Sequence, residues 1–201
     1  MGKVVLFDID GTLFNPEKFG KLIRLEFVKL LGIEEEELVR ANADYYANLE
    51  TTTDFNPRDI VAHIADRFGA DPEALNKVFW QNNQIYKESL YPDVLDTLKR
   101  LSKKHTLGIF SQGNEELQTR KLNASDITQY FDRDHLYIHR RKLDEDVLDQ
   151  LPEGAVIIDD NRDIAKSASA FREAIWINRR TDDGDPNVET IHTLEEVLYL
   201  V

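Results

Sequence analysis

The chain of 201 residues is 41% hydrophobic and 31% charged, enough for one domain with a modest insert and too hydrophobic for a disordered chain. It has no cysteine, which excludes disulfides, thiolate metal sites and a cysteine nucleophile, and no apolar run near the roughly 20 residues of a membrane span. Its net charge of −13 repels polyanions. We therefore expect a soluble cytoplasmic protein, monomeric or weakly dimeric, with neither nucleic acid nor a membrane as a partner.

The first predicted element is a buried strand that ends in two aspartates. The segment of residues 3–8 carries a continuous apolar run, which is typical of a strand buried on both faces of a parallel sheet. Gly11 then ends the run, within the sequence Asp8-Ile-Asp10-Gly11-Thr12. The segment predicts a strand followed by a tight turn that carries two carboxylates.

The next 75 or so residues are predicted to be helical. Between residues 15 and 90, apolar side chains recur at helical intervals, for example Phe19, Ile23 and Phe27. Asp71 followed by Pro72 is typical of a helix start. We predict three or four helices and no strand in this segment.

From residue 91 onward, strand and helix signals alternate. Strands are predicted at residues 106–110, 136–138, 155–158 and 174–177, and helices at residues 94–101, 115–122, 144–151, 164–171 and 193–200. Such alternation predicts an α/β fold, a doubly wound parallel sheet with helices on both faces. We expect residues 1–14 and 91–201 to form this core domain, residues 15–90 a second helical domain, and residues 181–187 a polar turn.

Polar side chains gather just past the ends of three predicted strands. They are Asp8 and Asp10, then Ser111, then Asp159, Asp160 and Asp163. Each residue alone also suits a turn or a helix cap, but open α/β sheets bind ligands at this edge. Carboxylates 4 Å apart repel by about 4 kcal/mol per pair at an effective dielectric constant near 20, so the cluster requires a cation. All-oxygen ligands favour Mg²⁺.

These residues resemble the motifs of the haloacid dehalogenase (HAD) superfamily, in its phosphatase-like branch, over nearly the whole chain. Residues 4–13 match every position of the family's first motif, hhhhDxDGT[LV]. Ser111 matches the second, with Gln112 where Asn is common, and Lys142 matches the third, without the prolines that often follow it. Asp159 and Asp163 have the four-residue spacing of the fourth motif. Asp160 falls between them.

The resemblance implies a role for each matched residue. Asp8 would be the nucleophile that forms an aspartyl-phosphate, and Asp10 the general acid and then the general base. Ser111, Gln112 and Lys142 would bind the phosphoryl oxygens. The Mg²⁺ ligands would be Asp8, the backbone carbonyl of Asp10, Asp159 and Asp163.

The resemblance also implies an activity and a place for the helical segment. The chain would be a Mg²⁺-dependent phosphomonoester hydrolase, with a Rossmann-like core and a small helical cap at residues 15–90 that closes over the site. A covered site would take a small phosphorylated metabolite, such as a sugar phosphate or a nucleoside monophosphate, and residues 54–58 form the best candidate loop for its leaving group.

Three alternatives remain open. A phosphomutase would share the site and differ in the phosphoryl acceptor. A haloacid dehalogenase would use the same nucleophile but lacks an acidic residue two positions later, so Asp10 argues against it. A non-catalytic phosphate-binding module would retain the scaffold without turnover.

Overall fold

A computed structural model describes residues 2–51, 54–143 and 147–201. The described residues form a six-stranded sheet in the order β3-β2-β1-β4-β5-β6, and every neighbouring pair of strands is parallel. The strands are β1 (Val4–Phe7), β2 (Thr106–Gln112), β3 (Leu136–His139), β4 (Val156–Asp159), β5 (Glu173–Ile177) and β6 (Glu189–Ile191). The predicted doubly wound α/β fold is confirmed.

The order of the strands places the end of β1 at the centre of the sheet. The chain runs from β1 outward to β2 and β3, then returns to the other side of β1 to form β4. The carboxyl ends of β1 and β4 therefore flank the point at which the strand order reverses, where α/β sheets bind ligands. Val5, Leu6 and Phe7 are fully buried, because helices cover both faces of the sheet.

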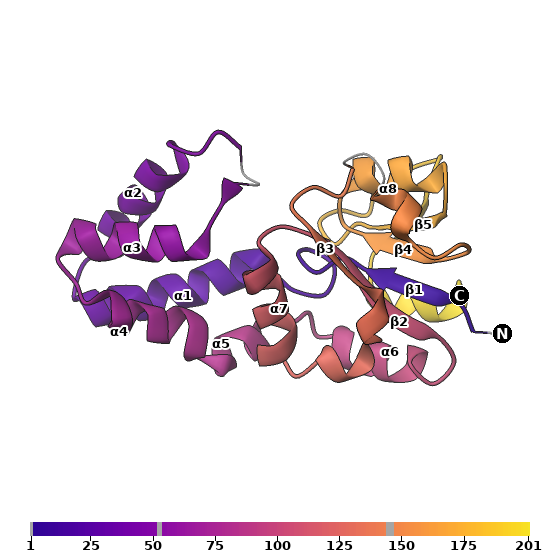
Figure 1. Cartoon of the computed structure of the whole chain (residues 1–201), viewed down its shortest axis with the longest axis horizontal. Coiled ribbons are helices and arrows are strands. Elements are labelled where there is room, and N and C mark those ends of the chain that lie inside the picture. Colours follow the sequence, from indigo (N-terminus) through magenta and orange to yellow (C-terminus); the bar gives the residue numbers. More distant parts are fainter. Residues whose placement is uncertain (1, 52–53, 144–146) are drawn as a thin grey trace.

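The core helices are α6 (Val94–Leu101), α7 (Glu115–Ala124) and α8 (Arg162–Ser169). Figure 1 shows α8 on one face of the sheet and α6 on the other. None of the described helices is both long and apolar enough to cross a membrane.

Three predictions for the core were wrong in detail. Residues 193–200 form a 3₁₀ helix, Leu194–Tyr199, in which Leu194 and Val197 are both fully buried, as the three-residue turn allows. Of the helix predicted at residues 144–151, the described part holds a 3₁₀ turn, Leu148–Gln150, because Pro152 disfavours helical conformation at Leu151; residues 144–146 lie outside the described residues. Strand β6 was not predicted, because Ile191 is the one apolar residue among its three.

Residues 16–88 form a helical segment beside the sheet, which we call the insert. It consists of α1 (Pro16–Leu31), α2 (Glu35–Tyr46), α3 (Pro57–Phe68), α4 (Pro72–Asn76), a π-helical turn (Lys77–Gln81) and α5 (Asn83–Glu88). Its described residues contain no strand, as predicted, but five α-helices where three or four were expected. The extra number arises because the π turn divides residues 72–88 into short pieces.

Local signals start and end the helices of the insert. Helices α1, α3 and α4 each begin with an Asn or Asp cap followed by proline at the first helical position: Asn15-Pro16, Asn56-Pro57 and Asp71-Pro72. Helices α1 and α3 end at Gly32 and Gly69, both with left-handed backbone.

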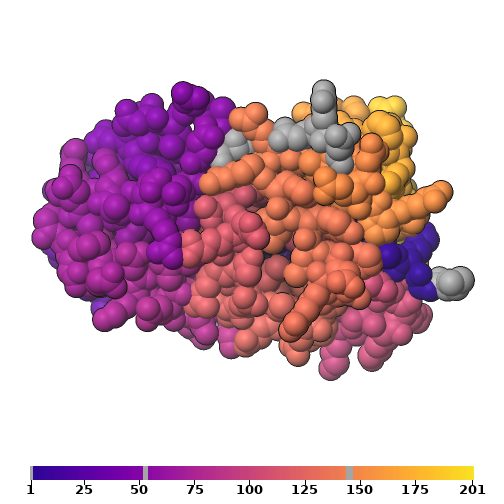
Figure 2. Space-filling view, viewed as in Figure 1, coloured from indigo at the N-terminus to yellow at the C-terminus, as the bar shows by residue number. Residues whose placement is uncertain are grey.

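The insert joins the core through two connections that run side by side. The Asn15 amide donates to the Ser89 carbonyl at 2.7 Å, and the Tyr91 amide donates to the Leu13 carbonyl at 3.1 Å. Figure 2 shows that the insert abuts the half of the molecule that contains the sheet. Helix α7 lies between the two, and it contacts α5 and carries Glu116, which pairs with Arg58 of α3. The insert is thus held against the edge of the sheet that carries the predicted site.

Candidate active site

The turn after β1 brings a buried carboxylate to the edge of the sheet. The Asp8 amide donates to the Ile158 carbonyl at 2.9 Å, which extends the pairing of β1 with β4 by one residue. Gly11 has a φ of 82°, and a Cβ atom at this position would lie 2.1 Å from Oδ2 of Asp160. Glycine is therefore required both by the backbone conformation and by the close approach of a second carboxylate.

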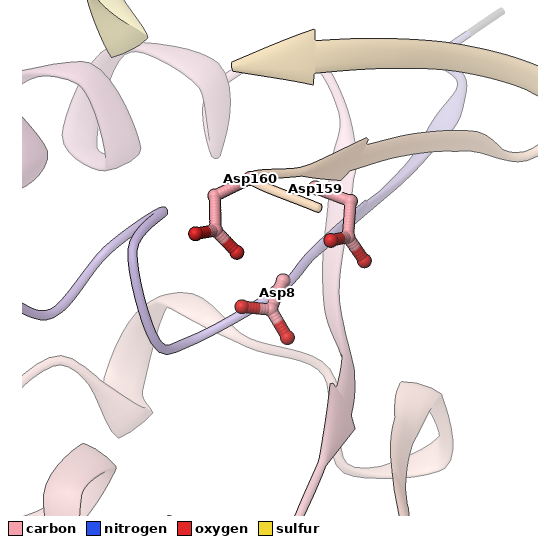
Figure 3. A group of neighbouring side chains, drawn as sticks. All are labelled: Asp8, Asp159 and Asp160. Carbon is pink, nitrogen blue, oxygen red and sulfur yellow. The ribbon is translucent and has the colours of Figure 1, made fainter. Parts of the chain in front are cut away.

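Three carboxylates meet at this point. Asp8, Asp159 and Asp160 each offer one oxygen, and these oxygens lie within 4.8 Å of one another (Figure 3). Asp159 ends β4, and Asp160 follows it. A compact set of carboxylate oxygens is the donor chemistry that hard divalent cations prefer, so these residues fit a Mg²⁺ ion.

The electrostatics of the cluster show the same need for a cation. Burial raises the pKa of Asp8 to about 8, with Lys142 opposing the shift and the neighbouring Asp159 and Asp160 adding to it. Burial and the charge of Asp159 raise the pKa of Asp160 to about 6. Without a bound cation, protons compete for these carboxylates near neutral pH.

Lys142 supplies a buried positive charge to the cluster. Its Nζ lies 2.6 Å from Oδ1 of Asp8 and 2.5 Å from Oδ2 of Asp159. Burial by itself would lower the pKa of Lys142, but the two carboxylates outweigh it and raise the pKa above its ordinary value. Lys142 is therefore held as the cation beside Asp8.

The residues predicted to bind phosphate surround the same carboxylate. Ser111 is fully buried at the end of β2, and its hydroxyl donates to Oδ1 of Asp8 at 3.2 Å. The side-chain oxygen of Gln112 accepts a hydrogen bond from the backbone amide of Lys142 at 3.0 Å. Ser111 and Lys142 thus contact Asp8 directly, and Gln112 joins them through the backbone of Lys142.

Asp10 has partners that were not predicted from the sequence. Its two carboxylate oxygens lie 2.7 and 2.6 Å from Nζ of Lys121, and Oδ2 accepts from Nε2 of Gln118 at 2.9 Å. Gln118 and Lys121 are buried on α7, in the stripe that also contains Leu117 and Leu122. The sequence signal that could have indicated these two partners is a pair of polar residues, three positions apart, within an otherwise apolar helix face.

Asp163 does not join the cluster. It lies in the first turn of α8, with an exposed side chain, and its backbone amide donates to Oδ1 of Asn161, which caps the helix. Among the described residues, the carboxylates that gather are those of Asp8, Asp159 and Asp160. From the four-residue spacing we expected Asp163 in the cluster, but the structure places Asp160 there. Helix α8 begins at Arg162, and Asp163 in its first turn is exposed to solvent.

A cavity of about 380 Å³ extends from this site into the insert. Its polar end includes Asp10, Gln112, Asn114, Gln118 and Lys121. The rest of its wall comes from α1, α2, α3, the segment before α3 and the π turn, and it is mainly apolar apart from Arg24 and Asn42: Phe19, Ile23, Phe27, Leu38, Tyr46, Phe55, Ile60, Ile64 and Phe79. Of the candidate catalytic residues, Asp10 therefore faces this cavity, together with its partners Gln118 and Lys121.

Comparisons with known proteins agree with this arrangement. The family model described as "Hydrolase: haloacid dehalogenase-like hydrolase" matches residues 3–171. A phosphoglycolate phosphatase of Aquifex aeolicus is 31% identical over 134 residues, which are 65% of this chain and 58% of that protein. A glyceraldehyde 3-phosphate phosphatase of Methanopyrus kandleri is 27% identical over 194 residues, which are 90% of this chain and 77% of that protein.

Two solved structures share the fold at low identity. A HAD phosphatase from Thermococcus onnurineus has a TM-score of 0.62 and 24% identity, with 100% of this chain and 97% of that chain covered. A HAD hydrolase from Bacillus subtilis, solved with bound magnesium, has a TM-score of 0.66 and 17% identity, with 99% and 98% covered.

Proposed function

We propose that this chain, which belongs to the haloacid dehalogenase-like hydrolases, is a Mg²⁺-dependent phosphomonoesterase that acts on a small phosphorylated metabolite. The observation that carries the proposal is the environment of Asp8, a buried carboxylate held by Lys142 and Ser111 beside two further carboxylates. The names of the two phosphatase relatives support the same reaction.

Asp8, Asp159 and Asp160 would hold the ion, together with the backbone carbonyl of Asp10. Their oxygens already lie close enough to share one cation. When bound, Mg²⁺ would neutralise charge on the carboxylates and on the phosphoryl group, which otherwise repel each other. We assign no ligand role to Asp163, whose side chain is exposed.

Asp8 is the proposed nucleophile. One of its oxygens attacks phosphorus, the bond from phosphorus to the ester oxygen breaks, and an aspartyl-phosphate forms. Ser111 and Lys142, which contact Asp8 directly, would donate hydrogen bonds to the phosphoryl oxygens during this step.

Asp10 is the proposed acid and base. Its carboxylate lies at the polar end of the cavity, where the leaving alcohol would sit. In its protonated form it would give a proton to the departing oxygen, and it would then take a proton from the water that hydrolyses the aspartyl-phosphate. Lys121, paired with both oxygens, would stabilise the anionic form between the two steps.

Release of inorganic phosphate from a panel of phosphorylated metabolites, with and without Mg²⁺, tests the proposal. We expect turnover that disappears after chelation and returns when Mg²⁺ is added. Asp8→Asn should lower kcat at least about 10³-fold with the fold retained, as judged by circular dichroism. Turnover that survives chelation, or normal turnover by Asp8→Asn, would contradict the proposal. Transfer of the phosphoryl group to a second sugar phosphate without phosphate release would instead identify a mutase.

A further inference from the structure

The cavity between the insert and helix α7 points to the chemical class of the alcohol that leaves. It meets the reaction site at Asp10, which forms one end of it together with Lys121. Beyond this end the side chains that surround it are chiefly aromatic and aliphatic, and the polar ones there are Arg24, which is paired with Glu35, and Asn42. A sugar placed here would lose the water bound to its hydroxyl groups and would find few polar partners in return.

The cavity is large enough for a leaving alcohol much larger than one of two or three carbons. A volume of about 380 Å³ lies within the range that binds drug-sized molecules. Phe19, Phe27, Leu38 and Phe79 are themselves buried, whereas Gly20 and Tyr46 are exposed, so the cavity reaches from the surface in among core side chains. Close packing leaves few voids of this size in a protein interior.

Two polar atoms in the wall, the side-chain oxygens of Gln118 and Asn42, lack a partner among the described residues. The side-chain oxygen of Asn42 on α2 is buried and accepts no hydrogen bond within the described part of the chain. A buried acceptor without a donor destabilises the fold, and a hydroxyl or amine on a ligand would relieve that cost.

We infer that the insert of this enzyme selects phosphate monoesters of bulky apolar alcohols, aromatic or branched aliphatic, in preference to sugar phosphates. The inference rests on the proposed function, because the cavity positions an ester only if Asp8 and Asp10 cleave it. It changes the expectation of a sugar phosphate or nucleoside monophosphate drawn from the sequence, because the polar groups of the wall gather at the end beside Asp10 and the remainder is chiefly apolar.

Gly20 on α1 provides a direct way to fill the cavity. It lines the cavity, and a Cβ atom at this position would meet nothing within 4 Å. Replacing a glycine inside a helix also favours the helix, so Gly20→Leu should fold. Lys21→Leu is the matched control, because it adds the same side chain to an exposed position of the same helix that does not line the cavity.

The experiment compares three primary alkyl esters, so that the leaving alcohols have similar acidity: ethyl phosphate, 3-phenylpropyl phosphate and glucose 6-phosphate. We expect the kcat/KM of the unmodified protein with the phenylpropyl ester to exceed those of the other two esters by about tenfold or more. Gly20→Leu should lower the ratio of the phenylpropyl to the ethyl value at least fivefold, chiefly through KM, while Lys21→Leu changes it by less than twofold. Equal kcat/KM for the three esters, a preference for the sugar ester, or an unchanged ratio in Gly20→Leu would overturn the inference.

A binding measurement separates this inference from the proposed reaction. Calorimetric titration with the product alcohol, 3-phenylpropanol, should show binding to the unmodified protein and to Lys21→Leu, and at least fivefold weaker binding to Gly20→Leu. If the phosphate esters are hydrolysed but the alcohol does not bind, the inference fails and the proposed function stands. If the alcohol binds but no phosphate ester is hydrolysed with Mg²⁺ present, the proposed function fails and the inferred selection of esters falls with it.

Discussion

The two halves of the molecule place polar and apolar side chains in opposite ways. In the sheet half, buried polar residues stand at strand ends, where Asp8 contacts Ser111 and Lys142, and Lys142 also contacts Asp159. The insert contributes the mainly apolar part of the wall of a cavity that it shares with α7. The comparison teaches that the sheet half contains the groups that can break a phosphate ester, whereas the insert contains the surface that can choose which ester enters.

The largest effect that we expect is on kcat, in a variant that lacks the proposed proton donor Asp10. Asp10→Asn should lower kcat for an alkyl phosphate by about 10²- to 10⁴-fold, because the alkoxide then leaves without a proton. For an aryl phosphate of similar size the loss should be at least tenfold smaller, because its leaving group needs less help. Steady-state kinetics with both esters checks this prediction. Equal losses would remove Asp10 from the role of general acid.

The second prediction concerns the buried cation of the sheet half. Lys142→Met should lower kcat/KM about 10²-fold or more and destabilise the fold by about 3–5 kcal/mol, because Asp8 and Asp159 lose their buried partner. Urea unfolding measures the stability, and Mg²⁺ should restore part of it by replacing the missing charge. Lys21→Leu serves as the control for loss of a lysine from an exposed site. Unchanged stability would show that Lys142 does not hold these carboxylates.

The third prediction sharpens the assignment of the metal ligands. Asp160→Asn should weaken Mg²⁺ binding at least tenfold, whereas Asp163→Asn should change it by less than twofold, because only Asp160 belongs to the three-carboxylate cluster. Isothermal titration calorimetry of the two variants makes the comparison directly. The reverse order would restore Asp163 as the ligand.

The smallest expected effect is a pH dependence of the stability that Mg²⁺ adds. In the metal-free protein the pKa of Asp8 is raised to about 8 and that of Asp160 to about 6, both from 3.8. Between pH 3.8 and about 8, the folded state therefore binds more protons than the unfolded state. The free energy of unfolding falls as pH rises through that range. Mg²⁺ replaces those protons, so the rise in Tm on adding it should be a few degrees larger at pH 8 than at pH 5.5. A rise in Tm that does not depend on pH would contradict the coupling of metal and proton binding.

The fold and the position of Asp8 at the end of β1 could be predicted from the sequence because their signals are local. Strand β1 is a continuous apolar run, and the turn after it carries Asp8, Asp10 and Gly11 in a fixed pattern. The shorter elements could not be found in this way. Strand β6 has three residues with a single apolar side chain, Ile191, so it carries no apolar run and no alternating pattern.

The choice among the aspartates of the last motif depended on where a helix begins. Asp160 and Asp163 both follow β4, and spacing alone does not say which of them points inward. Asn161 caps α8, so Asp163 falls in the first turn of that helix, whereas Asp160 approaches Gly11. If the N-cap of α8 lay one residue earlier or later, a different carboxylate would lie at the edge of the sheet.

The cavity was also beyond the reach of the sequence. Phe19, Ile23 and Phe27 recur at helical spacing, and this pattern is the same for a filled core and for a hollow one. Gln118 and Lys121 were missed because they join the site by contacting Asp10, which is more than one hundred residues away in the chain. Such contacts are determined by packing between elements rather than by the pattern within one element.

The covalent intermediate on Asp8 gives the most direct test of the whole account. The Asp10→Asn variant should still accept a phosphoryl group from an aryl phosphate but should lose the base that activates water, so the aspartyl-phosphate should accumulate. After acid quenching and proteolysis, mass spectrometry should find one phosphoryl group on the peptide that contains Asp8, and none when Asp8→Asn is added to the same variant. A phosphoryl group on a different residue, or its persistence in the double variant, would contradict the assignment of Asp8 as the nucleophile.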